Sequence, residues 1–490
     1  MSEKKSERAD RIKKITELEK AGINPYPAKS NKDFSVFDIL DNFKKLENEK
    51  KTVSTAGRLR SMRLHGNLAF CDLADESGKI QLVFNKKSMI EESYKLFTKT
   101  VDVSDFIEVK GMLFTTKTGQ NSIEVSEWKM LAKALRQVPD EHFGFKDEEE
   151  RLRKRYLDIL LDNNLRETII KKAQFWNAVR EFLAKKGFQE VETPILETTT
   201  GGADARPFVT HHNALDIDVY LRISMGELWQ KRLMVAGFEK TFEIGRQFRN
   251  EGMSAEHLQD YTQMEFYWAY ADYEKGMRLV EDLFKDVAKK VFGTLKFKIK
   301  DFNVDLGKKW EHYDYAKLIR EKTGIDVMNA KLPEIEKKLT ALKVNYDKKG
   351  FNITRAIDNL WKYCRKDIAG PGFLVNVPVA ISPLAKKNDD NPKTVQRFQP
   401  IIAGSELGNG YSELNDPIDQ RRRFEEQQAL RDAGDDEAQM ADYEFVEALE
   451  YGMPPTCGFG MSERVFSFLM DKPVRDCQAF PLVRPKNNSK

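Results

Sequence analysis

The segment 241–270 carries polar side chains at the two-residue spacing that places them on one face of a β-strand. It reads as two strands joined by a polar loop that contains His257. An arginine, a carboxylate and tyrosines then share one face of a hairpin, and the other face is apolar. A solvated sheet face is the simpler alternative, but it needs fewer such groups, so we interpret this face as a ligand-binding surface. The polar face comprises Glu243, Gln247, Arg249, Tyr261, Gln263, Glu265 and Tyr267, and the apolar face Phe242, Ile244, Phe248, Met264, Phe266, Trp268 and Tyr270.

A second polar group of residues lies nearer the C-terminus. In the segment 406–415, strand spacing points Asn409, Tyr411 and Glu413 the same way, and neighbouring glycines allow another backbone to approach closely. Further on, the glycine-rich stretch 458–464 ends in Arg464 before a helix-like run, where an arginine could meet a phosphate. Taken singly, each glycine motif is weak evidence.

Short alternating runs precede these segments and indicate a different domain. Five runs are strand-like, and a helix-like stretch, 88–99, separates the third from the fourth. This is the element order of an OB-fold barrel, which often binds single-stranded nucleic acid. Cationic and aromatic residues favour contact with RNA, and a solvated barrel rim is the alternative. The runs are 52–60, 67–72, 79–85, 106–114 and 122–128, and the contact candidates are Arg58, Arg60, Arg63, His65 and Phe70.

Composition bounds the class of protein. The chain has 490 residues, 40% hydrophobic and 32% charged, which fits several folded domains and excludes fibrous and disordered classes. Its 81 basic and 78 acidic residues nearly balance, so any polyanion must be met by local patches. The four cysteines form no metal or disulfide pattern, and neither a membrane span nor a signal peptide is found, so we expect a cytoplasmic protein without a membrane partner.

Together, the motifs resemble those of the class II lysyl-tRNA synthetases of subclass IIb. The resemblance runs from 8–12 to 480–485, and the combination of motifs is highly specific. The segments that carry it are Pro25–Pro27, Gly201–Phe208, His212–Asp216, Phe248–Gly252, Gly408–Asn415 and Glu447–Thr456.

The resemblance implies an α+β fold, in which an N-terminal OB-fold β-barrel reads the tRNA anticodon and a class II catalytic domain has an antiparallel sheet flanked by helices. It implies an ATP-dependent lysine–tRNA ligase, which converts L-lysine and ATP to lysyl-adenylate and pyrophosphate and then transfers lysine to the 3′ end of tRNA(Lys). Its first class motif matches 182–194 and implies a homodimer.

The resemblance also implies roles for individual residues. Arg249 would hold the α-phosphate and the lysine carboxylate, and Arg464 would clamp the γ-phosphate, so these two are the expected catalytic residues. The other assignments are Glu251, His257 and Tyr261 for ATP; Glu406 for magnesium; Phe70 and Gln81 for anticodon bases; Gly202 and Glu227 for the α-amino group of lysine; and Glu265, Tyr267, Asn409, Tyr411 and Glu413 for its side chain.

Elementary chemistry agrees with the lysine assignment. A lysine side chain ends in a compact cation with three donors, so its pocket needs carboxylates and neutral acceptors. Glu265, Asn409 and Glu413 supply them on strand-spaced polar faces. An aspartate-activating relative would need a cation there, and these faces offer none beyond Arg249.

Four consecutive parts are expected. Residues 1–50 form a helical extension, 51–135 the anticodon-binding barrel, 136–165 a charged linker and 166–490 the catalytic domain. The first helix, 8–22, has a thin apolar stripe of Ile12, Ile15 and Leu18. It is either a solvated extension or an arm that grips tRNA.

Three departures from the family pattern alter these expectations. Gln399 stands where the family usually has a glutamate, which predicts fewer or weaker magnesium sites. The segment 223–227 is one residue longer than usual, which affects the placement of Glu227. The stretch 458–464 is one residue shorter, so Arg464 could approach by a different backbone route. A catalytically weakened tRNA-binding paralogue, a relative that activates another amino acid and one that transfers lysine to a protein are the alternative functions.

Overall fold

The computed structural model describes residues 2–139, 147–203, 205–252, 254–346, 351–434 and 438–485. The chain divides into two compact units, Met1–Arg151 and Leu152–Lys490. The expected linker, 136–165, includes residues 140–146, and the expected catalytic domain includes 204, 253, 347–350, 435–437 and 486–490, all outside the described residues. The bounds of the four expected parts stay predictions.

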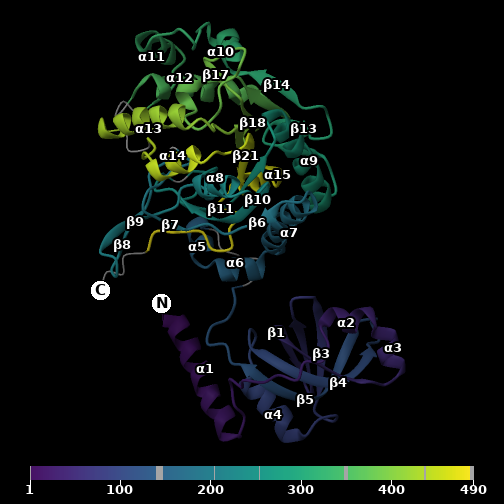
Figure 1. Cartoon of the computed structure of the whole chain (residues 1–490). Coiled ribbons are helices and arrows are strands. Elements are labelled where there is room, and N and C mark those ends of the chain that lie inside the picture. Colours follow the sequence, from purple (N-terminus) through teal and green to yellow (C-terminus); the bar gives the residue numbers. More distant parts are fainter. Residues whose placement is uncertain are drawn as a thin grey trace. The chain divides into compact units, whose positions relative to one another are not determined.

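The first unit contains the predicted OB-fold barrel (Figure 1). Its strands close in the order β1-β2-β3-β5-β4, with β3 and β5 parallel, and α4 (Glu91–Thr100) lies between the third and fourth strands in sequence. The fold prediction is therefore confirmed, although the first strand is longer than expected. The strands are β1 (Thr52–His65), β2 (Leu68–Ala74), β3 (Lys79–Asn85), β4 (Phe106–Thr115) and β5 (Asn121–Ala132), after helices α2 (Val36–Asp41) and α3 (Phe43–Asn48).

Helix α1 (Ser2–Lys20) is anchored to the barrel mainly by polar groups. The Arg11 guanidinium is buried and donates hydrogen bonds to the carbonyl oxygens of Val103 and Ala134 at 3.2 and 3.0 Å. Leu18 is fully buried, but Ile12 is 39% exposed, so the predicted apolar stripe is wrong at that position. A fully solvated extension does not describe this docked helix.

The second unit is built on a nine-stranded sheet, which is antiparallel except at β14–β15 and β10–β6. The predicted hairpin is present, since β10 and β11 pair with Phe242 opposite Phe266 and Glu243 opposite Glu265. The order along the sheet is β14 (Glu311–Asp314), β15 (Gly372–Val375), β18 (Arg397–Ile402), β20 (Asn409–Ser412), β21 (Thr456–Ser462), β11 (Asp260–Ala269), β10 (Lys240–Phe248) and β6 (Gln189–Glu190), with β19 (Ser405–Glu406) on β18.

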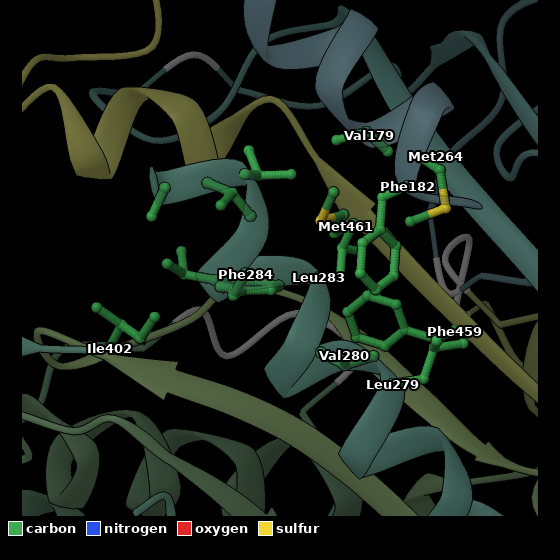
Figure 2. Packing of buried hydrophobic residues seen from close by; sticks show 14 of the residues in the cluster. Val179, Phe182, Met264, Leu279, Val280, Leu283, Phe284, Ile402, Phe459 and Met461 are labelled. Carbon is green, nitrogen blue, oxygen red and sulfur yellow. The ribbon is translucent and has the colours of Figure 1, made fainter. Parts of the chain in front are cut away.

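Helices α7 (Asn163–Lys185) and α9 (Tyr273–Phe292) cover the apolar back of this sheet (Figure 2). Phe182 of α7 and Leu283 of α9 pack in one buried cluster with Met264 of β11 and Phe459 of β21. Tyr270 was expected on this apolar face, but β11 ends at Ala269 and Tyr270 is 63% exposed. Burying the back in this way leaves the polar front of the sheet available for a ligand.

The remaining elements surround the sheet (Figure 1). Within the described ranges, every helix is too short or too polar to cross a membrane. The helices are α5 (Glu148–Arg153), α6 (Arg155–Leu161), α8 (Glu227–Val235), α10 (Tyr315–Thr323), α11 (Leu332–Ala341), α12 (Ile353–Cys364), α13 (Pro417–Asp432), α14 (Tyr443–Glu450) and α15 (Arg464–Leu469), with short 3₁₀ turns at Arg365–Asp367 and Val379–Ile381. The small sheets contain β7 (Leu196–Glu197), β8 (Val209–His212) and β9 (Ile217–Leu221); β12 (Lys296–Ile299) and β13 (Phe302–Asp305); and β16 (Val377–Pro378) and β17 (Thr394–Val395).

Candidate active site

A cavity of about 380 Å³ lies on the polar front of the second unit's sheet. Every site residue that was expected in the catalytic domain lines this one cavity, although the residues come from strands, helices and loops far apart in sequence. They are Gly202, Glu227, Arg249, Glu251, His257, Tyr261, Glu265, Tyr267, Glu406, Asn409, Tyr411, Glu413 and Arg464.

Two glycines of β21 keep the floor of the cavity open. Strand β21 lies between β11 and β20, and its Gly460 is opposite both Glu265 and Asn409. A Cβ atom on Gly458 would lie 2.2 Å from a Glu413 carboxylate oxygen and 2.6 Å from the Tyr267 ring. Glycine at this position therefore lets the side chains of the two flanking strands meet across the middle one.

One end of the cavity is acidic and buried. Glu227, Glu265 and Glu413 have exposed fractions of 5%, 5% and 2%, and they share this end with Lys231, of which 1% is exposed. The Lys231 ammonium lies 2.7 Å from Glu227 Oε1 and 2.5 Å from Glu413 Oε2. The hydroxyl of Tyr411 donates a hydrogen bond to Glu227.

Lys231 is not among the site residues that the sequence predicts. It lies four residues after Glu227, however, at the spacing at which side chains of a helix meet. Burial lowers the pKa of Lys231, but Glu227 and Glu413 outweigh this effect and raise it, so the ammonium stays charged. Arg397 also lines the cavity and donates a 2.7 Å hydrogen bond to Asn409. The sequence-based expectation concerned the front faces of β10, β11 and β20, and these two cations come from other elements, Lys231 from α8 and Arg397 from β18.

Glu265 is held by three donors. Its Oε1 accepts hydrogen bonds from the Met225 backbone N–H at 3.0 Å and from the Gln263 amide at 2.6 Å, and its Oε2 accepts one from the Tyr267 hydroxyl at 3.0 Å. Burial and the nearby Glu227 carboxylate raise the pKa of Glu265 to about 7, against the effect of these donors. An incoming cation would favour the ionised form of this carboxyl.

The lengthened segment 223–227 folds as a turn that leads into helix α8. Gly226 caps the helix with φ 65°, and a Cβ atom there would lie 2.0 Å from Thr193 Oγ1. The preceding Met225 is fully buried and contributes the backbone donor to Glu265. Glu227 then starts the helix and lines the cavity, where a Cβ atom on Gly202 would lie 3.0 Å from its carboxylate.

The other end of the cavity is rich in arginine. The Arg249 guanidinium lies 5.9 Å from the centre of the Tyr261 ring and donates a 3.4 Å hydrogen bond to the Ile223 carbonyl. The desolvating surroundings lower the pKa of His257, and the positive charge of Arg464 lowers it further, so the imidazole is neutral at pH 7. A neutral ring beside two arginines suits hydrogen bonding to an anion without adding charge.

The shortened stretch 458–464 still delivers its arginine to the cavity. Strand β21 continues to Ser462, and Arg464 begins helix α15. The Arg464 guanidinium lies 2.7 Å from the Glu256 carboxylate, which also lies 2.9 Å from the ammonium of Lys300. Glu256 was not among the expected site residues, and we find no signal in the sequence that would have singled it out.

The two expected anticodon residues lie in the first unit, on neighbouring strands. Phe70 of β2 is opposite Arg63 of β1, and Gln81 of β3 accepts a 2.9 Å hydrogen bond from Ser122. Arg58 was expected to act with Phe70 on RNA. Its guanidinium lies 4.2 Å from the centre of the Phe106 ring of β4 and donates a hydrogen bond to the Ser104 carbonyl, and its contact with RNA stays a prediction.

Comparisons with known proteins match both units. The family described as class II tRNA synthetases (D, K and N) matches residues 147–484, and the OB-fold nucleic acid binding domain matches 53–131. The chain is 43% identical to the lysine–tRNA ligase of Thermotoga maritima over 482 residues, which cover 97% of this chain and 95% of that protein. It is 44% identical to the lysine–tRNA ligase of Thermosipho africanus over 489 residues, 98% of this chain and 96% of the relative. The chain therefore belongs to the lysyl-tRNA synthetase family of class II tRNA synthetases.

Proposed function

We propose that the protein is an ATP-dependent lysine–tRNA ligase, which forms lysyl-adenylate and then transfers lysine to the 3′ end of tRNA(Lys). The observation that carries this proposal is the polarity of one cavity, which has three buried carboxylates at one end and two arginines at the other. An amino acid with two ammonium groups complements the first end, and a polyphosphate complements the second.

The acidic end would hold L-lysine. Gly202 and Glu227 would receive its α-amino group, and Arg249 would hold its carboxylate. A buried carboxylate gains most from a partner of opposite charge, so the ε-ammonium would be recognised there rather than at the surface. The residues around the ε-ammonium and the aliphatic stem would be Glu265, Tyr267, Asn409, Tyr411 and Glu413.

The arginine-rich end would hold ATP. Arg249 would lie at the α-phosphate and Arg464 at the γ-phosphate, while Glu251, His257 and Tyr261 would meet the rest of the nucleotide. The lysine carboxylate would attack the α-phosphorus, the bond from that phosphorus to the pyrophosphate oxygen would break, and pyrophosphate would leave. Because the substrate supplies the nucleophile, these side chains contribute by positioning and by neutralising charge.

The donor groups near the phosphates fit a magnesium ion that is bound partly by ATP. Glu406 supplies one carboxylate, which accepts a hydrogen bond from the Trp361 indole, and Gln399 supplies an amide. Mg²⁺ in nucleotide sites is usually held by one or two carboxylates together with substrate phosphates. Glu406 would be the protein ligand, and the bound ion would neutralise phosphate charge.

The remaining parts of the proposal concern partners and location. Phe70 and Gln81 of the barrel would contact anticodon bases of tRNA(Lys). The class motif at 182–194 supports a homodimer. The four buried, unpaired thiols, Cys71, Cys364, Cys457 and Cys477, suit a reducing compartment, so we place the protein in the cytoplasm without a membrane partner.

Other functions are less well supported. A catalytically weakened paralogue would follow if the shortened stretch 458–464 carried Arg464 away from the cavity, but Arg464 lines it. Transfer of lysine to a protein would not require the barrel, which matches a nucleic acid binding domain. Lysine-dependent exchange of pyrophosphate into ATP, followed by charging of tRNA(Lys), tests the proposal directly.

Replacing Glu256 by glutamine should lower the KM for ATP by about five-fold, because it releases Arg464 from an ion pair worth roughly 1 kcal/mol at this exposure. Steady-state ATP–pyrophosphate exchange measures this, with Asp260→Asn, an exposed ion-pair change on β11, as the control. A rise in the KM for ATP would instead mean that Glu256 assists ATP binding.

Replacing Phe70 by alanine should reduce kcat/KM for tRNA charging about ten-fold while leaving ATP–pyrophosphate exchange unchanged, because one base would lose a stacking partner in a separate unit. Phe37→Ala removes an exposed phenylalanine of the same unit and should change neither rate. Loss of exchange in a folded Phe70→Ala protein would contradict this separation of sites.

A further inference from the structure

A buried ammonium of the protein itself pairs with two of the carboxylates that line the acidic end of the cavity. Lys231 bridges Glu227 and Glu413 at 2.7 and 2.5 Å, and the centres of the Tyr411 and Phe445 rings lie 5.4 and 5.8 Å from its Nζ atom. Water is therefore excluded from the ammonium, and its charge acts on the two carboxylates at close range.

Glu227 and Glu413 are the carboxylates that the proposed function assigns to opposite ends of the lysine substrate. Together with Glu265 they make three acidic groups at this end of the cavity, among the residues that the structure describes. The substrate brings two ammonium groups, and its carboxylate is assigned to Arg249. Lys231 is the third ammonium, so three carboxylates would face three ammonium groups in the loaded cavity.

We propose that Lys231 is a positioning residue for the amino-acid substrate. Its ammonium keeps the Glu227 and Glu413 carboxylates at a fixed distance from each other, and it neutralises the one carboxylate charge of the three that the two ammonium groups of the substrate leave unbalanced. This inference rests on the proposed function. A fixed spacing matters because the two carboxylates must meet both amino groups of one short molecule. Lys231 acts through them and touches no reacting atom.

Removing Lys231 should change the protonation of the carboxyl groups that line the acidic end of the cavity. The groups that face the Lys231 ammonium are Glu227 on its own helix, Glu413 just after β20, the Tyr411 ring of β20 and the apolar Phe445 ring of α14, and Glu265 and Tyr267 of β11 line the same end of the cavity as the two carboxylates. Burial raises the pKa of Glu413, and the Lys231 ammonium opposes that rise. Without the ammonium the clustered carboxylates would retain about one more proton, which the substrate would have to displace.

The test compares Lys231→Met and Lys231→Gln with the unsubstituted protein in lysine-dependent ATP–pyrophosphate exchange between about pH 6 and 9. At pH 7 the KM for lysine should rise about ten-fold or more while the KM for ATP changes less than about two-fold. In the Lys231 variants the logarithm of the lysine KM should also fall more steeply with rising pH than in the unsubstituted protein. The slopes should differ by about one unit per pH unit, because the variants release one more proton from the clustered carboxyl groups when lysine binds. The glutamine variant retains a hydrogen-bond donor and serves if the methionine variant does not fold.

Lys133→Met is the matched control. The Lys133 ammonium is also buried between two carboxylates, at 2.5 Å from Asp102 and 2.7 Å from Asp105, but it lies in the barrel unit. Its loss should lower stability without changing either KM. Folded Lys231 variants with an unchanged lysine KM and an unchanged pH slope would overturn the inference. Absence of exchange in the unsubstituted protein would instead overturn the proposed function on which the inference rests.

Discussion

Replacing Glu413 by glutamine should raise the KM for lysine about 30-fold or more and leave the KM for ATP nearly unchanged. Removing one partner of a buried, hydrogen-bonded charge pair costs roughly 2 to 5 kcal/mol, and 1.36 kcal/mol corresponds to a factor of ten. Glu413 is 2% exposed, so solvent cannot replace the lost charge. The substitution also leaves Lys231 with Glu227 as its remaining acidic partner within contact distance, which places its uncompensated charge beside the incoming ammonium.

Steady-state exchange with lysine and ATP varied in turn measures both constants. Glu256→Gln is the matched comparison, since it makes the same chemical change at the opposite end of the cavity and should leave the KM for lysine unchanged while lowering the KM for ATP. Equal effects of Glu413→Gln on the two KM values would remove the basis for placing the lysine side chain at this end. Thermal unfolding should accompany the kinetics, so that a loss of fold is not mistaken for a loss of recognition.

Replacing Arg249 by glutamine should reduce the rate of adenylate formation about 10²- to 10³-fold, the loss typical when one donor to developing transition-state charge is removed. Arg249 lines the cavity, and in the proposed function it would contact both the lysine carboxylate and the α-phosphate of ATP. The effect should fall on kcat more than on the KM for ATP, because the interaction strengthens as charge develops.

Arg246 offers a matched control for Arg249. It lies three residues earlier, on β10, and its guanidinium pairs with Asp260 outside the set of residues that line the cavity. Arg246→Gln should therefore leave kcat within about two-fold of the unsubstituted value. Single-turnover formation of adenylate measures both variants, and equal losses would mean that a general change of charge, rather than contact with the substrates, explains the result.

The sequence predicts the parts of the site that follow from strand periodicity. Alternation along 241–270 predicts which side chains share the polar face, because neighbouring residues of a strand point to opposite faces. The pairing of β10 with β11, and the position of Glu265 in the cavity, agree with that pattern. The pattern cannot predict where a strand ends, and for this reason Tyr270 was misplaced.

Pairings between distant side chains could not be read from the sequence. Glu256 meets Arg464 and Arg58 meets Phe106, and each pair depends on how separate elements pack. Lys231 is an intermediate case. Its spacing from Glu227 is visible on a helix, but its contact with Glu413 exists because α8 packs against the front of the sheet. Charged residues on a helix are usually solvated, so spacing alone would not have identified a buried bridge.

The lengthened segment 223–227 shows how a local departure can be accommodated. Its extra residue falls in a turn whose glycine has a positive φ, so the added length does not displace Glu227 from the cavity. The turn also supplies the backbone donor of Met225 to Glu265. Sequence comparison identifies the extra residue, but the conformation that absorbs it depends on the close contact with Thr193.

The most direct test of the central claim is ATP–pyrophosphate exchange with each standard amino acid in turn, in the presence of Mg²⁺. A cavity with buried carboxylates at one end and arginines at the other should support exchange with lysine at a rate far above that with any other amino acid. No exchange at saturating lysine, or faster exchange with an acidic or neutral amino acid, would contradict the account.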